Sequence, residues 1–301
     1  MKEIAKSLRE VDSKFRALTS ITQDEYNTIY SVFDGLMSSK ILNYTLKGEK
    51  RVVKEYQERK NSSLQGTQSK LDFILLYLKE NPNQSHHALL FEMAQSKVSE
   101  WVSYILPVLL DTFKMLGYTP KTGESFSIED LENLDYLIID VVEREVPRKV
   151  DYEAQKSEYS GKKKKHTLKN LVITDQNGLI LFSSQEYKGK THDKKMSEDV
   201  IMKIDECYLL ADLGFQGITE DYPSALLPFK KPKNKELTAE QKGINTLISQ
   251  LRVKIEHAFA GVKRVKIMRN KIRLKTDKVR QMVGMIAMAI HNLRCKSRHC
   301  T

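Results

Sequence analysis

The spacing of apolar residues changes near residue 134, and this change constrains the fold more than any other feature of the chain. Before it, apolar residues recur every three or four positions, which indicates amphipathic helices. After it, apolar runs of strand length appear at 134–142, 166–174, 178–184 and 207–211. The sequence therefore predicts an all-helical region followed by an α/β domain, in which helices flank a mixed sheet.

Helices are also expected between and after these strands, at 192–205, 238–264 and 277–296. The last of them is apolar enough that we expect it to pack on the sheet. The Asn177-Gly178 pair predicts a tight hairpin turn between the second and third strands.

The helical region contains a motif typical of DNA-binding proteins. Short helices are expected at about 69–80, at 85–94 and from Ser96 onward, with a tight turn between the second and the third. This arrangement indicates a helix-turn-helix, and a plain helical subdomain is the alternative. Pro107 is expected to end or kink the third helix.

We expect three parts in the chain. Residues 1–60 form an N-terminal helical region and linker, 61–125 a helix-turn-helix DNA-binding domain, and 126–301 the catalytic domain. Within the first part, Thr22 followed by Glu25 matches a capping box at a helix start.

The net charge of +11 is concentrated in residues 252–298, where Lys and Arg greatly outnumber the two acids, Glu256 and Asp277. A basic block of this kind indicates binding to nucleic acid, although a solvated helix is the simpler alternative. No apolar run is long enough to cross a membrane, and the first residues lack an apolar signal core. With only three cysteines, no disulfide framework is expected. We therefore expect a cytoplasmic protein associated with the nucleoid.

Three carboxylates occupy positions that suit a metal site. Asp140 closes the first strand, Asp212 follows the fourth, and Glu256 is a lone acid in a basic helix. Carboxylate oxygens suit Mg²⁺ or Mn²⁺, and two such ions can promote phosphodiester chemistry. Each acid alone could equally be a turn residue or, for Glu256, an ion-pair partner of Arg252. No nucleotide-binding glycine loop or serine nucleophile motif is present.

Five segments in order carry a resemblance to a known family: 159–169, 189–193, 211–217, 228–232 and 253–259. In these segments the chain resembles DDE-superfamily transposases of bacterial insertion sequences, in the branch related to Harbinger elements. The resemblance implies an RNase H-like catalytic fold, a preceding helix-turn-helix, and metal-dependent cutting and joining of DNA.

The resemblance also implies which residues form the site. Asp140, Asp212 and Glu256 would be both the catalytic residues and the ligands of two Mg²⁺ or Mn²⁺ ions. Asp193 competes with Asp212 for the second position, and Asp193 with His192 would be accessory residues.

A related signature, Tyr-x2-Arg-x3-Glu-x6-Lys, is matched by Arg252, Glu256 and Lys263, whereas Ser249 stands at the tyrosine position. Phe215 also stands where the family commonly has tyrosine.

Double-stranded DNA, at element ends and at the target site, is the expected partner. Contacts to its phosphates are expected from Lys97, Lys162, Lys163, Lys164, Lys165, Lys169, Arg252, Lys263 and Arg264. For the lysine run 162–165, a solvated loop is the alternative.

The expected function is that of a transposase. It would bind the terminal inverted repeats of its element, cleave the DNA at the ends and join the 3′-hydroxyl to target DNA. Because two ends must meet, we expect a homodimer or larger assembly on DNA. The alternatives are a catalytically silent DNA-binding protein derived from a transposase, or a structure-specific nuclease.

Overall fold

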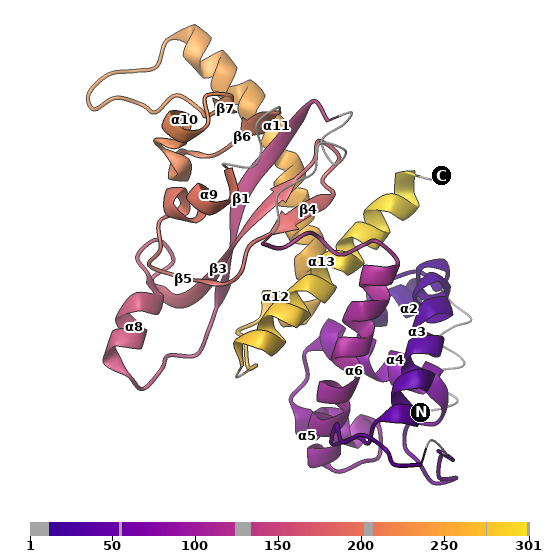
Figure 1. The fold of residues 1–301 in the computed structure, drawn as a ribbon. Helices are drawn as coiled ribbons and strands as arrows, with labels where there is room; N and C mark the ends of the chain where they lie inside the picture. The colour runs from indigo at the N-terminus through magenta and orange to yellow at the C-terminus, as the bar shows by residue number, and fades with distance from the viewer. Residues whose placement is uncertain (1–11, 54–55, 124–133, 202–206, 275, 300–301) are drawn as a thin grey trace. The chain divides into compact units, whose positions relative to one another are not determined.

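The structure, a computed structural model, describes residues 12–53, 56–123, 134–201, 207–274 and 276–299 (Figure 1). The chain divides into two compact units. The first comprises the described residues up to Thr119 together with Lys263–Asn270 and most of the C-terminal segment from Lys278, and the second comprises Pro120–Val262 with Lys271–Asp277. The two units are defined by contacts between residues and not by function. The division into 1–60, 61–125 and 126–301 that the sequence suggests therefore remains a prediction.

Among the described residues of the first unit, the regular elements are helices joined by loops. Its helices are α2 (Asp12–Thr19), α3 (Gln23–Asn43), α4 (Gly66–Glu80), α5 (Gln84–Leu90), α6 (Gln95–Met115), α12 (Lys266–Arg269) and most of α13 (Asp277–His299). The capping box at the start of α3 is confirmed, since the Thr22 hydroxyl accepts from the Glu25 N–H at 3.2 Å and the Glu25 carboxylate accepts from the Thr22 N–H at 2.7 Å.

Helices α4, α5 and α6 form the three-helix arrangement expected for a helix-turn-helix. Of the two effects expected of Pro107, the end of the third helix is wrong, because α6 continues through Pro107 to Met115, and the kink remains a prediction. A proline removes one backbone hydrogen bond. The helix is held against its neighbours by fully buried side chains on both sides of Pro107, namely Ile105, Leu109 and Phe113.

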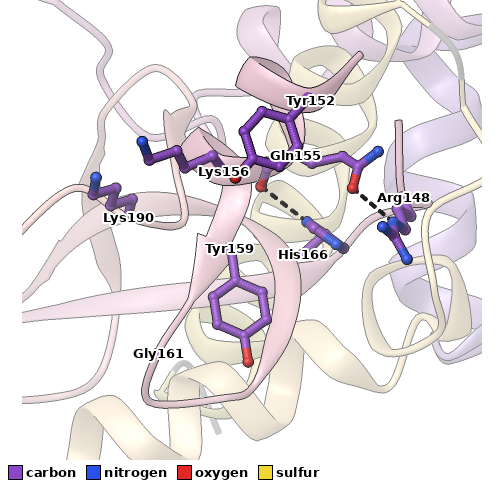
Figure 2. Close-up of a pocket in the computed structure, with 8 residues that line it drawn as sticks. All are labelled: Arg148, Tyr152, Gln155, Lys156, Tyr159, Gly161, His166 and Lys190. Atoms are coloured by element: carbon purple, nitrogen blue, oxygen red, sulfur yellow. Dashed lines mark hydrogen bonds between the residues drawn. The ribbon is translucent and has the colours of Figure 1, made fainter. Parts of the chain in front are cut away.

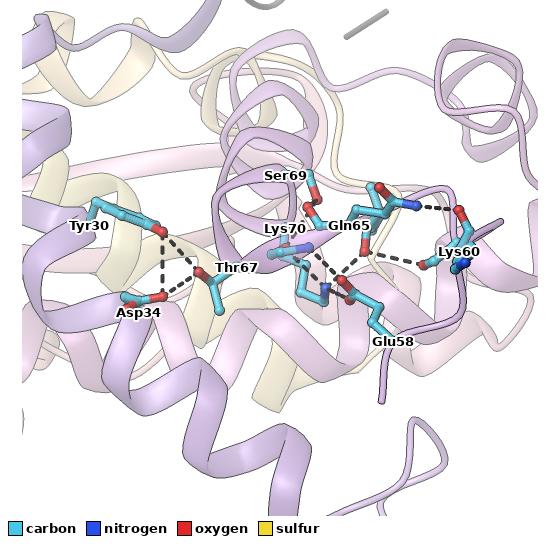
Figure 3. Close-up of polar contacts among 11 residues, drawn as sticks. Tyr30, Asp34, Glu58, Lys60, Gln65, Thr67, Ser69 and Lys70 are labelled. Atoms are coloured by element: carbon cyan, nitrogen blue, oxygen red, sulfur yellow. Dashed lines mark hydrogen bonds and ion pairs between the residues drawn. The ribbon is translucent and has the colours of Figure 1, made fainter. Parts of the chain in front are cut away.

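A buried lysine fastens the start of α4 to the chain before it (Figure 3). The Lys70 side chain is completely buried, and its ammonium donates to Glu58 Oε1 at 2.5 Å, Leu64 O at 2.9 Å and Gly66 O at 3.0 Å. It also lies over the Trp101 ring of α6, 5.3 Å from the centroid. All three ammonium protons therefore have acceptors, which offsets the cost of burying the charge.

The expectation that the final helix packs on the sheet is wrong. Most of α13 belongs to the first unit, where Asn292 Nδ2 donates to Tyr118 O at 2.9 Å and Lys296 Nζ donates to Gly117 O at 3.3 Å. An apolar helical face shows that a helix must be covered, but it does not identify the covering surface.

The second unit is built on a mixed sheet, as predicted. Its strands are β1 (Tyr136–Glu145), β2 (Tyr159–Ser160), β3 (Lys165–Thr174), β4 (Ile180–Ser183), β5 (Tyr187–Lys188), β6 (Tyr208–Leu210) and β7 (Ala225–Leu226). The strand order is β2-β3-β1-β6-β7, with β4 and β5 also paired to β3. β1 is antiparallel to β3 and parallel to β6, and β6 is parallel to β7.

Helices cover both faces of this sheet. They are α8 (Tyr152–Glu158), α9 (Asp193–Ile201), the short η1 (Leu213–Phe215), α10 (Ile218–Asp221) and α11 (Ala239–Lys263). Leu137 and Ile139 of β1 pack in a cluster that includes Met196 of α9, whereas Ile138 packs against Ile255 of α11. Because side chains alternate along a strand, α9 and α11 lie on opposite sides of β1 (Figure 1).

Candidate active site

Asp140 lies on β1, and Asp212 lies two residues beyond the end of β6, the strand that is parallel and adjacent to β1. β1 and β6 pair in register, with Ile138 opposite Leu210, and the two aspartates follow these residues by two positions. Since strand side chains repeat every two residues, Asp140 shares the face of Ile138, which is the face covered by α11. β1 runs on to Glu145, so Asp140 lies within the strand and does not close it as predicted.

The Asp140 carboxyl is partly buried, with 21% of its side chain exposed, and it lies close to both positive and negative groups. Burial is the main cause that raises its pKa to about 6, and the charge of Asp212 acts in the same direction. Three interactions oppose this rise: the Val141 N–H donates to Oδ1 at 2.7 Å, Arg252 Nη2 of α11 lies 3.2 Å from Oδ2, and the charge of Lys162 also favours the ionised form. Arg252, expected to contact phosphate, is therefore paired with Asp140 in this structure.

Glu256 is carried by the helix that covers these strands. Its neighbour Ile255 is fully buried against Ile138 and Leu210, while Glu256 itself is exposed. Among the described residues, no group of three or more His, Cys, Asp or Glu side chains is close enough to hold a metal ion. The structure thus brings Asp140 and Asp212 together and sets Glu256 on the adjacent helix, without drawing it into a closed cluster.

Asp193 and Asp212 face each other across Gly214. The Asp212 carboxylate accepts from the Gly214 N–H at 2.7 Å, and a Cβ on this glycine would lie 2.8 Å from both Asp212 Oδ1 and Asp193 Oδ2. Only a residue without a side chain leaves both carboxylates in place. This role of Gly214 was not predicted from the sequence, although a glycine two residues after Asp212 is the pattern that indicates it. His192 is exposed beside Asp193 at the start of α9.

The donor set suits a divalent cation. Asp140 and Asp212 offer hard oxygen ligands, and their proximity already raises the pKa of Asp140. The guanidinium of Arg252 pairs with Asp140 and stabilises the ionised form of this carboxylate. Asp193 adds a third carboxylate beside Asp212. The chemistry of these residues is therefore compatible with Mg²⁺ or Mn²⁺.

Comparison with known proteins identifies the family. A family model described as DDE superfamily endonuclease matches residues 139–292, which include Asp140, Asp193, Asp212 and Glu256. The chain belongs to the DDE superfamily endonucleases. A second model, the helix-turn-helix of DDE superfamily endonucleases, matches residues 62–114, which contain all of α4 and α5 and all of α6 except its last residue. The mixed sheet with flanking helices is consistent with an RNase H-like DDE domain.

One relative is the probable transposase for insertion sequence element IS702 of Microchaete diplosiphon. It is 30% identical over 201 residues, which cover 66% of this chain and 71% of the relative. No solved structure matches the chain. The branch related to Harbinger elements remains a prediction. Within the described part of the chain, no helix has the length and apolar character required to cross a membrane.

The lysines expected to bind DNA in this DDE endonuclease occupy two kinds of environment. Lys162, Lys163 and Lys164 are exposed in the turn between β2 and β3, and the charge of Lys162 lowers the pKa of Asp140. The turn therefore lies within electrostatic range of Asp140. In contrast, Lys169 is only 13% exposed and pairs with Asp193 at 3.0 Å.

The remaining basic residues differ in their availability. Lys97 pairs with Glu100 of the same helix at 2.7 Å, and Lys165 pairs with Glu145 at 2.7 Å. Lys263 and Arg264 are exposed at the end of α11 and in the turn that follows. Exposed ion pairs are weak, so Lys97 and Lys165 can exchange their partners for a phosphate at little cost.

Proposed function

We propose that this DDE endonuclease is the transposase of an insertion sequence. It would bind the terminal inverted repeats with its helix-turn-helix, cleave the DNA at the element's ends and join the 3′-hydroxyl to target DNA. The observation that carries the proposal is the proximity of Asp140 on β1 to Asp212, just beyond the end of the adjacent parallel strand β6, with Arg252 of α11 paired to Asp140. The relative named as a probable transposase supports the same assignment.

Asp140, Asp212 and Glu256 would hold two divalent ions, with Asp193 as an accessory carboxylate. Such ions, when bound, activate an attacking oxygen and stabilise the leaving oxygen of a phosphodiester. The chain's own residues shape the surroundings of this chemistry. Arg252 favours the ionised form of Asp140 in a partly buried position, and the charge of Lys162 acts in the same direction. Both residues also offer positive charge to a DNA phosphate.

Two steps of transposition would use the same site. Hydrolysis at the element's end and attack by the freed 3′-hydroxyl are both displacements at phosphorus, so one arrangement of carboxylates serves both. The exposed Lys163, Lys164, Lys263 and Arg264 would hold the DNA backbone during these steps. Because two ends must be joined to one target, the active form would be a homodimer or a larger assembly on DNA.

The test compares two DNA substrates. Labelled duplex carrying the element's end, taken from the genomic DNA that flanks the reading frame, is incubated with the full chain and Mg²⁺ beside a random duplex of equal length. The proposal predicts end-specific cleavage and products in which the 3′ end is joined to target DNA. Binding to the end without nicking at any protein concentration would identify a silent DNA-binding protein. Equal cutting of both duplexes would identify a nuclease.

A further inference from the structure

A pocket of about 620 Å³ lies beside α8 in the second unit, and the carboxylate site makes no use of it (Figure 2). Its walls come from α8, from the β2–β3 turn and from the segment after β5. Its volume is in the range of pockets that hold a small organic ligand.

The charge of the pocket suits an anion. Arg148, Lys156 and Lys190 line it, and all three side chains are exposed. Among the described residues that line the pocket, none is Asp or Glu. No carboxylate in the described part of the chain pairs with Lys156 or Lys190. Three cations without a neutralising acid favour a phosphate group.

The pocket also presents aromatic rings to solvent. Tyr152 is 70% exposed and Tyr159 is 44% exposed, and Tyr159 meets the His166 ring edge-on at 5.7 Å between centroids. A phosphate alone would not need these rings. Exposed aromatic rings next to cations are the combination with which proteins stack the bases and hold the backbone of single strands.

The walls of the pocket are braced from within. The side-chain carbonyl of Gln155 accepts from Arg148 Nε at 2.7 Å, and its backbone carbonyl accepts from His166 Nδ1 at 3.1 Å (Figure 2). A Cβ at Gly189 would overlap both Thr167 Oγ1 and Glu158 O. The absence of a side chain at Gly189 therefore lets its backbone pass close to Glu158 and Thr167, which places the next residue, Lys190, at the rim of the pocket. Arg148 and His166 are therefore each fixed by a hydrogen bond to Gln155, whereas the side chains of Lys156, Lys190 and Tyr152 extend into solvent.

The pocket is connected to the carboxylate site by β3. His166 lies six residues before Val172, which pairs with Asp140, so the two sites are about 20 Å apart along the strand. The lysine turn starts at the pocket, where Gly161 forms part of the wall, and the charge of Lys162 reaches Asp140. A DNA strand that leaves the carboxylates along this basic path would arrive at the pocket.

We propose that this pocket binds one unpaired nucleotide of the DNA strand that the carboxylate site processes. The base would stack on Tyr152 and Tyr159, and its phosphate would contact Arg148, Lys156 and Lys190. A paired base is excluded, because its faces are covered by neighbouring base pairs. The inference rests on the proposed function only in taking DNA as the substrate.

Binding of the full chain to three probes tests this proposal: a short oligothymidine strand, an end duplex with a single-stranded overhang and the same duplex with a blunt end. Stacking on an aromatic side chain predicts that Tyr152→Ala and Tyr159→Ala each weaken binding of the first two probes about 5- to 100-fold. Binding of the blunt duplex should be unchanged. Tyr159→Phe should bind as the unmodified chain does. Tyr208→Ala, which alters a tyrosine that is 59% exposed outside the pocket, is the matched control.

Three outcomes would overturn the proposal: overhang binding that is unaffected in both alanine variants, equal weakening of blunt and overhang binding, or an equal effect of Tyr208→Ala. Because Tyr152 is largely exposed, its variant keeps the test valid even where Tyr159→Ala disturbs folding. The outcome is also separable from the proposed function. If the tyrosines are needed for overhang binding but the chain never cuts end DNA, the nucleotide pocket is supported and the transposase function is refuted. If the chain cuts end DNA and neither tyrosine is needed for overhang binding, the transposase function is supported and the nucleotide pocket is refuted.

Discussion

His87 should make the stability of the first unit depend on pH. This histidine of α5 is fully buried, and its ring lies 4.5–5.4 Å, between centroids, from those of Phe73, Tyr77 and Phe91. Its Nε2 donates to Phe73 O at 3.2 Å. Burial is the main cause that lowers the pKa of His87 from 6.5 to about 4, so the folded unit holds the ring neutral.

The sign and size of the effect follow from this difference. Between pH 6.5 and 4 the unfolded chain takes up a proton that the folded unit does not, so the free energy of unfolding falls as the pH falls. The full difference between the two pKa values corresponds to about 3.4 kcal/mol in the free energy of unfolding. About 2 kcal/mol of this stability should already be lost when the pH falls from 7.5 to 5. Above pH 6.5 the contribution is fully present.

Urea unfolding at these two pH values measures the effect. Trp101 is the single tryptophan of the chain and lies in α6, so its fluorescence reports on the first unit. In His87→Phe, the decrease in the free energy of unfolding between pH 7.5 and pH 5 should be smaller by about 2 kcal/mol than in the unmodified chain. This holds whatever the substitution does to stability at pH 7.5. His86→Phe, at an exposed neighbouring position, is the control and should keep it. A His87→Phe variant with the same pH dependence as the unmodified chain would refute the reasoning.

Five further substitutions have expected outcomes that thermal or urea unfolding can check. Gly189→Ala should destabilise the second unit because its Cβ would overlap neighbouring atoms, whereas Gly161→Ala, with nothing within 4 Å, should be neutral. Lys70→Ala should cost about 3–5 kcal/mol, since it leaves Glu58 without its buried partner; a loss below 1 kcal/mol would contradict this. Ile255→Ala should cost about 2–5 kcal/mol and Ile255→Val about 0.5–1.5, and equal costs would argue against tight packing of α11 on the sheet.

The sequence was informative where a local pattern determines a local structure. The capping box at Thr22 and the Asn177-Gly178 turn depend on neighbouring residues, and both form as expected. The mixed sheet also follows from its apolar runs. The match of the family model to a segment that contains Asp140, Asp212 and Glu256 agrees with the resemblance seen in the sequence.

Features that depend on distant partners could not be predicted in this way. The apolar face of α13 does not specify whether a sheet or other helices cover it. The ion pair between Arg252 and Asp140 joins residues far apart in the chain. The pocket beside α8 combines exposed residues from several segments, and exposed residues leave no apolar period in the sequence.

The central claim is that Glu256 acts with Asp140 and Asp212 as one metal-binding site. The most direct test is the rate at which end DNA is cleaved with Mg²⁺ by the unmodified chain, by Glu256→Gln and by Glu240→Gln. Glu240 is an exposed acid on the same helix and controls for the loss of one negative charge. Cleavage by Glu256→Gln should fall to background, while Glu240→Gln should cleave normally. Full cleavage by Glu256→Gln would contradict it.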